Sequence, residues 1–183
     1  MTKPVRTLTT EYCQQWKLPA YSHVNESYSK LAQVCQQPRE FEFPRAQLPP
    51  HFDFTGPYHS AIGRAPVAFP WEKLTGQPLI YASMGTIQNR LVPVFEAIAQ
   101  ACVGLEVQLV ISLGGGMPPA MLPPLAGTPL VVSYAPQLEL LKRATLTLTH
   151  AGLNIALESL TQGVLMVAIP ITTDQPGVAA RIV

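Results

Sequence analysis

The second half of the chain alternates short apolar runs with turn residues and with segments whose apolar positions follow helical spacing. Buried parallel strands have this composition, and strands that alternate with helices are typical of stacked βαβ units. The pattern therefore predicts an α/β fold with a Rossmann-like parallel sheet over residues 79–183. The expected strands are 79–82, 107–112, 130–133, 145–149 and 164–169, and the expected helices are 91–103, 138–143 and 153–162.

Prolines divide the rest of the chain. More than half of the 19 prolines lie in residues 1–78, interleaved with aromatic residues, so this region cannot be long helices throughout. Two short helices are expected, at 10–18 behind a threonine cap and at 27–37 before Pro38, with a short strand around Phe52. A crossover rich in glycine and proline, beginning at residues 114–116, predicts a loop with little helix.

Composition narrows the classes of protein. Of the 183 residues, 48% are hydrophobic and 13% charged, which is enough apolar material for a core. A net charge of +1 gives no basic surface for nucleic acid. No apolar run approaches the roughly 18 residues of a membrane span, and the start has no signal-peptide pattern, so a cytoplasmic location is expected. Cys13, Cys35 and Cys102 fit neither a disulfide framework nor a metal site.

Small, hydroxyl-bearing and amide residues follow the expected strands, where ligands bind in a parallel α/β sheet. These positions are residues 83–86, 114–116, 134–137, 150–154 and 172–175. The strand at 145–149 brings His150 to its tip, and Gly152 lets the backbone turn closely into a helix. A helix N-terminus binds a diphosphate through free N–H groups and its dipole, without Lys or Arg. A net charge near zero is therefore compatible with a phosphate ligand.

Each of these residues also has a purely structural interpretation. Asn154 and Glu158 share a helix face, and Glu158 is placed to accept from ribose hydroxyls. On local spacing alone, however, a helix cap for Asn154 and a solvated surface acid for Glu158 are favoured. His150 taken alone is more often a packed histidine than a ligand. Asp174 either contacts a sugar or caps the helix opened by Pro176.

Several of these residues stand in a fixed order along the chain. They are Tyr134-Ala135-Pro136-Gln137, His150-Ala151-Gly152-Leu153-Asn154-Ile155-Ala156-Leu157-Glu158, Gly163-Val164, Pro170 and Asp174-Gln175. This order and spacing resemble the donor-binding signature of the UDP-glycosyltransferase superfamily, which has the GT-B fold, and are most similar to bacterial and cyanobacterial carotenoid (zeaxanthin) glucosyltransferases. The resemblance implies that residues 79–183 are a C-terminal, donor-binding domain. Residues 1–78 would be the tail of the acceptor-side domain and the interdomain linker.

The resemblance also implies a role for each matching residue. Tyr134 would stack on the uracil, where Trp is commoner, and Glu158 would hold the ribose hydroxyls. The other nucleotide contacts would be Gly85 and Thr86 beside the phosphates, Ala135 and Gln137 at the nucleoside, and His150, Gly152, Asn154 and Ile155 at the diphosphate. The donor sugar would meet Asp174 and Gln175. The departures from the family pattern are Ile155 for Ser, Leu165 for Pro and Val178 for Asn.

The implied reaction is an inverting transfer of a hexose from a UDP-sugar to a lipophilic hydroxyl acceptor. It needs no metal or other cofactor, and its only membrane contact would be peripheral, through the acceptor. The catalytic base of the family, a histidine, has no match, because His23, His51 and His59 lie in unrelated contexts.

The chain also stops within a predicted helix, so we expect a truncated protein. An inactive remnant or a sugar-nucleotide-binding module is the alternative. An NAD oxidoreductase is disfavoured, because residues 83–86 lack the glycine pattern of a dinucleotide site.

Overall fold

The computed structural model describes residues 3–60, 62–87 and 89–183. Its contacts divide the chain into two compact units, Met1–Gly56 and Pro57–Val183. Residues 57–78 pack within the second unit, where Phe69 belongs to the core. The assignment of residues 1–78 to the acceptor side and linker stays a prediction. Within the described residues, no helix is long and apolar enough to span a bilayer.

The first unit holds one helix and a small sheet. Helix α1 (Lys3–Gln15) is followed by the strands β1 (Gln33–Cys35) and β2 (Phe52–Phe54), which pair in parallel. Two 3-10 turns, η1 (Val24–Ser27) and η2 (Arg39–Phe41), lie between these elements. The predicted strand around Phe52 is confirmed, and the predicted helix at 10–18 begins earlier than expected.

The predicted helix at 27–37 is wrong. The hydroxyl of Ser29 accepts hydrogen bonds from the backbone N–H groups of Leu31 and Ala32, at 3.1 and 3.3 Å. The backbone N–H of Gln33 then donates to the carbonyl of His51 at 2.8 Å. A local serine turn and a pairing with a distant strand therefore replace the hydrogen bonds of the predicted helix.

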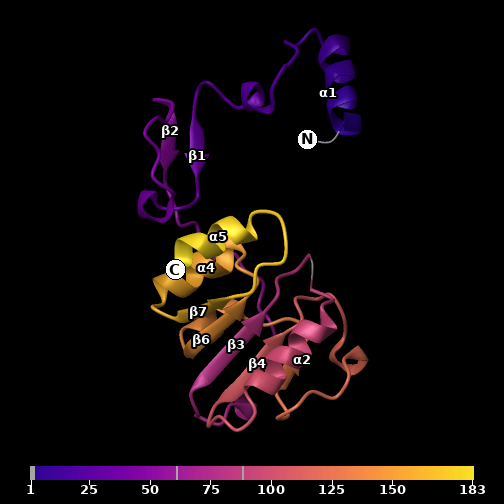
Figure 1. Cartoon of the computed structure of the whole chain (residues 1–183), viewed down its shortest axis with the longest axis vertical. Coiled ribbons are helices and arrows are strands. Elements are labelled where there is room, and N and C mark those ends of the chain that lie inside the picture. The colour runs from indigo at the N-terminus through magenta and orange to yellow at the C-terminus, as the bar shows by residue number, and fades with distance from the viewer. Residues whose placement is uncertain (1–2, 61, 88) are drawn as a thin grey trace. The chain divides into compact units, whose positions relative to one another are not determined.

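The second unit contains a parallel five-stranded sheet, as predicted. The strands β3 (Leu79–Ser83), β4 (Gln108–Ser112), β5 (Leu130–Val132), β6 (Ala144–Thr149) and β7 (Leu165–Ala168) are arranged in the order β5-β4-β3-β6-β7. In Figure 1, β4, β3, β6 and β7 lie side by side. The chain moves outward from β3 to β5 and then returns to the other side of β3. The direction of winding therefore reverses between β3 and β6, which is where ligands bind in such sheets.

Helices cover both faces of this sheet. Helix α2 (Val92–Ala101) buries Phe95 and Ile98 against Ile80 on one face. Helices α3 (Gln137–Leu141) and α4 (Leu153–Thr161) pack against Tyr81 on the other face, and α5 (Gln175–Ile182) packs on α4. The remaining elements are the 3-10 helices η3 (Trp71–Lys73) and η4 (Pro119–Met121), and η4 is the only helix in the described crossover between β4 and β5.

Candidate functional site

The imidazole of His150 lies between two glycines at the point where the winding of the sheet reverses. A Cβ atom on Gly85, in the loop after β3, would come within 2.6 Å of His150 Nε2. A Cβ atom on Gly152 would come within 2.7 Å of the same ring. Because ordinary carbon contacts are much longer, the ring occupies this place only while both positions lack a side chain. The structure thus brings together three residues predicted at the phosphates.

The backbone after His150 turns sharply into helix α4. Ala151 is fully buried with φ of 62°, and its N–H donates to the Thr149 hydroxyl at 3.2 Å. Gly152 is the N-cap, without a side-chain cap, and its carbonyl accepts the first helical hydrogen bond, from Ala156 at 3.1 Å. The N–H groups of residues 153–155 precede that bond and so face the loop side of the helix. The free amides and the helix dipole make this helix end electropositive without any formal charge.

The surroundings of His150 favour the neutral form of its imidazole. Burial lowers its pKa, while the Ser83 backbone and the carboxylate of Asp174 act in the opposite direction. No hydrogen bond of ordinary geometry reaches the buried Nδ1 atom from the described residues. A bound anion would favour the charged imidazolium over the neutral form.

A polar network surrounds Glu158, which is only 2% exposed. Gln137 donates its amide to Oε2, and the guanidinium of Arg64 donates to Oε1 at 2.7 Å. The hydroxyl of Tyr81 donates to the amide oxygen of Gln137 at 3.5 Å, and burial raises the pKa of Tyr81 to about 12. The interpretation of Glu158 as a solvated surface acid is therefore wrong. A buried carboxylate is satisfied here by two donors, as burial requires.

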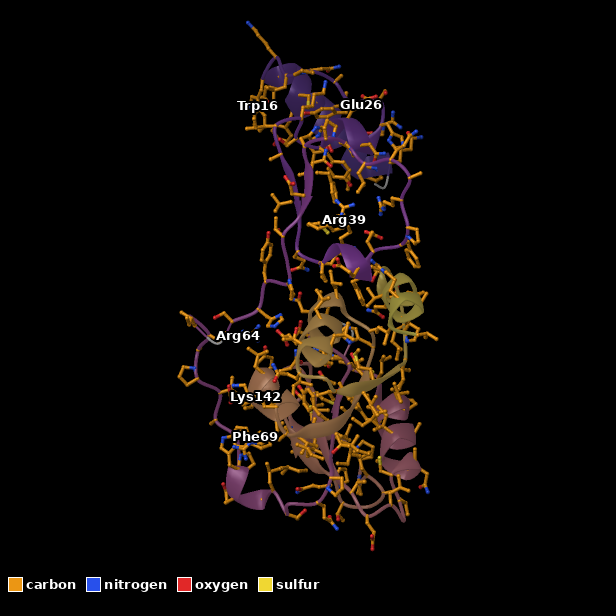
Figure 2. The ribbon with its side chains drawn as sticks, turned by 90° about the vertical axis from the view of Figure 1, so that its left-hand side faces the viewer. Trp16, Glu26, Arg39, Arg64, Phe69 and Lys142 are labelled. Carbon is orange, nitrogen blue, oxygen red and sulfur yellow. The ribbon has the colours of Figure 1, made fainter. Side chains whose placement is uncertain are left out.

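Arg64 was missed by the sequence analysis. It lies on an irregular segment of the second unit (Figure 2) and pairs with a carboxylate 94 residues further along the chain. Nothing in the residues around Arg64 signals this partner. Asn89 was also missed: it is 2% exposed and donates to the carbonyl of Gly114 at 3.0 Å, which ties the loops after β3 and β4 together.

The residues predicted to contact the uracil and the rest of the nucleoside lie beside this network. Tyr134 lies in the loop after β5, and the residue is 51% exposed. Ala135 is buried beneath it, and Gln137 begins helix α3. Because Gln137 contacts Glu158, the predicted nucleoside and ribose positions are joined by a direct hydrogen bond.

The remaining predicted residues take different places. Thr86 and Asn154 are exposed, and Asn154 is not the helix cap, since Gly152 holds that position. Ile155 is buried in the core, which leaves only its backbone for a ligand. Asp174 occupies the N-cap position of α5 but makes no capping hydrogen bond, and its carboxylate accepts from the Thr173 hydroxyl at 3.0 Å.

Gln175 is mostly buried, and its side chain holds the loop that precedes α5. Its amide oxygen accepts hydrogen bonds from the N–H groups of Ile171 and Thr172, at 2.8 and 2.9 Å. The oxygen is therefore already used within the protein, and only the amide nitrogen offers a donor to a sugar. Asp174 and Gln175 as sugar contacts stay predictions.

The fold is that of the GT-B glycosyltransferase class. The structure superimposes on the crystal structure of the glycotransferase of kitacinnamycin with a TM-score of 0.77 and 23% identity, over 97% of this chain and 46% of that chain. The family model "UDP-glucoronosyl and UDP-glucosyl transferase" matches residues 17–183, so the chain belongs to the UDP-glycosyltransferase family.

Two curated relatives carry the same printed name, zeaxanthin glucosyltransferase. The protein from Pseudescherichia vulneris is 34% identical over 174 residues, and the protein from Pantoea ananas is 31% identical over 175 residues. Each alignment covers 94% of this chain and 41% of the relative. The chain therefore spans less than half the length of these relatives.

Proposed function

We propose that this chain supplies the donor-binding part of a UDP-sugar-dependent glycosyltransferase. The observation that carries the proposal is the arrangement of His150 at the N-terminus of α4, with the buried carboxylate of Glu158 one turn further along the same helix. The diphosphate would bind the amides of residues 152–155 and the imidazole, and the ribose would bind Glu158. The uracil would stack on Tyr134, a half-exposed residue.

The reaction we propose is an inverting transfer of a hexosyl group. As the acceptor oxygen attacks the anomeric carbon, the bond to the diphosphate breaks, and the departing UDP gains negative charge. The helix dipole and His150 would stabilise that charge in place, which is why the proposal includes no metal or other cofactor. Asp174 and the Gln175 amide nitrogen would orient the hydroxyls of the donor sugar.

The acceptor we propose is a lipophilic alcohol of the carotenoid type. Support comes from the alignments with the two zeaxanthin glucosyltransferases, which cover 94% of this chain. The proposal includes a cytoplasmic reaction, in which the protein would meet a membrane only peripherally, through this acceptor.

A second candidate function is sugar-nucleotide binding without transfer. It is favoured by the content of the site, because every residue assigned above would contact the donor, and binding requires no more than that. Calorimetry with UDP and UDP-glucose, run beside an assay for sugar hydrolysis and transfer, separates the two. We expect saturable binding of both nucleotides. Transfer to a hydroxyl acceptor supports the enzyme, binding without turnover supports the module, and no binding by the folded chain contradicts both.

A further inference from the structure

The carboxylate proposed to hold the ribose is closed to solvent. The side chain of Glu158 is 3% exposed, and each of its oxygens already accepts a hydrogen bond, Oε1 from Arg64 and Oε2 from Gln137. A ribose hydroxyl needs open approach to one of these oxygens, because a hydrogen bond requires a donor within about 3 Å. One of the two covering side chains must therefore move before a nucleotide is fully bound.

Arg64 is the side chain that is held less firmly. Its side chain is 47% exposed, and it belongs to an irregular segment, outside any helix or strand. Gln137, in contrast, lies in helix α3, and the buried hydroxyl of Tyr81 donates to its amide oxygen. A half-exposed guanidinium regains water when it leaves the carboxylate, whereas a rotated Gln137 would lose two partners at once.

We infer that Arg64 is an internal competitor of the nucleotide's ribose. In the free protein its guanidinium occupies Oε1 of Glu158, and the ribose hydroxyls replace it when a nucleotide binds, while the bond from Gln137 to Oε2 remains. This inference rests on the proposed function, because it concerns the same site. It assigns Arg64 an effect opposite to that of an ordinary binding residue: Arg64 weakens the apparent affinity for UDP.

The size of the effect follows from the exposure of the ion pair. Apparent affinity is the intrinsic affinity multiplied by the fraction of open sites. An ion pair with one half-exposed partner is screened by water, so we expect the closed form to lower the affinity for UDP by about two- to fivefold. A nucleotide without ribose hydroxyls gains nothing from Oε1 and leaves the pair closed.

The test compares UDP with 2′,3′-dideoxyuridine diphosphate in calorimetric titrations of the full chain. Arg64→Met should bind UDP about two- to fivefold more tightly than the wild type and bind the dideoxy nucleotide unchanged. Arg64→Lys, which keeps a charge but loses the planar guanidinium, should show a smaller gain of the same sign. If circular dichroism shows that Arg64→Met is unfolded, the affinity of Arg64→Lys for the two nucleotides decides the test.

Arg45→Met is the matched control. Arg45 pairs with Glu42, which also accepts from a glutamine amide, Gln37, but this cluster lies in the unit that ends at Gly56. We expect no change in UDP affinity for Arg45→Met. The inferred role of Arg64 would be overturned if the folded Arg64 variants bound UDP no more tightly than the wild type. It would also be overturned if their affinity for the dideoxy nucleotide rose as much as their affinity for UDP. Loss of UDP binding in every protein, the wild type included, would instead overturn the proposed function.

Discussion

Replacing Glu158 with alanine is expected to weaken UDP binding by at least about tenfold. Hydrogen bonds to a charged acceptor contribute roughly 1.5–3 kcal/mol each, and about 1.4 kcal/mol corresponds to a factor of ten in affinity. The substitution also removes the acceptor of both Gln137 and Arg64. Because Gln137 then keeps a partly buried amide without this partner, we expect the free energy of unfolding to fall by about 1–3 kcal/mol. Calorimetry measures the affinity, and urea denaturation measures the stability.

Two further variants show whether the loss comes from the carboxylate. Glu158→Gln keeps the size of the side chain but not its charge, so it should retain more stability than alanine and still bind UDP poorly. Glu139→Ala removes an acid that is 47% exposed and paired with Lys142 in the same unit. Such surface pairs contribute little, so UDP affinity should not change. If the folded Glu158→Ala protein bound UDP as tightly as the wild type, the ribose would not bind at Glu158.

Replacing Gly85 with alanine is the second change with a large expected effect. The backbone of Gly85 has φ of 77°, which costs a residue with a side chain about 1–2 kcal/mol. The new Cβ would also stand 2.6 Å from His150 Nε2, so the ring must leave its place between the glycines. We expect lower stability from the first effect and a loss of UDP affinity of about tenfold or more from the second, since a hydrogen bond to a charged group contributes roughly 1.5–3 kcal/mol and about 1.4 kcal/mol is a factor of ten.

Gly76→Ala separates these two effects. Gly76 has a similar backbone conformation, with φ of 83°, but a Cβ there would meet no atom within 4 Å. Both variants should therefore lose similar stability in thermal denaturation, while only Gly85→Ala should lose UDP affinity. Equal UDP binding by the two variants would show that the position of the His150 ring does not matter to the nucleotide.

The sheet could be predicted from the sequence because its information is local. A strand buried on both faces reads as a continuous apolar run, as at residues 79–82 and 109–111, and the loops after these strands could be placed with them. The order of residues from Tyr134 to Gln175 then indicated which loops carry the site. The helix predicted at 27–37 failed because β1 is fixed by pairing with a later strand, which the helix end signal at Pro38 cannot indicate.

Two features of the candidate site could not be predicted from the sequence for the same reason. Arg64 contacts Glu158 at a sequence separation of 94, and its segment has no motif of its own. The family pattern placed Gln175 at the sugar, but the structure uses its amide oxygen to hold the backbone of Ile171 and Thr172. In both cases the role of a polar side chain depends on which distant donors and acceptors the fold brings to it.

The most direct measurement is the pKa of His150 by NMR of the imidazole rings, with and without UDP. The chain has four histidines, and the spectrum of a His150→Asn variant assigns the relevant signals. In the free protein, burial should keep this pKa below its ordinary value. A diphosphate against the ring favours imidazolium, so UDP should raise the pKa, and binding should tighten as the pH falls through the interval between the two values. Saturable UDP binding that leaves the titration of His150 unchanged would contradict the account.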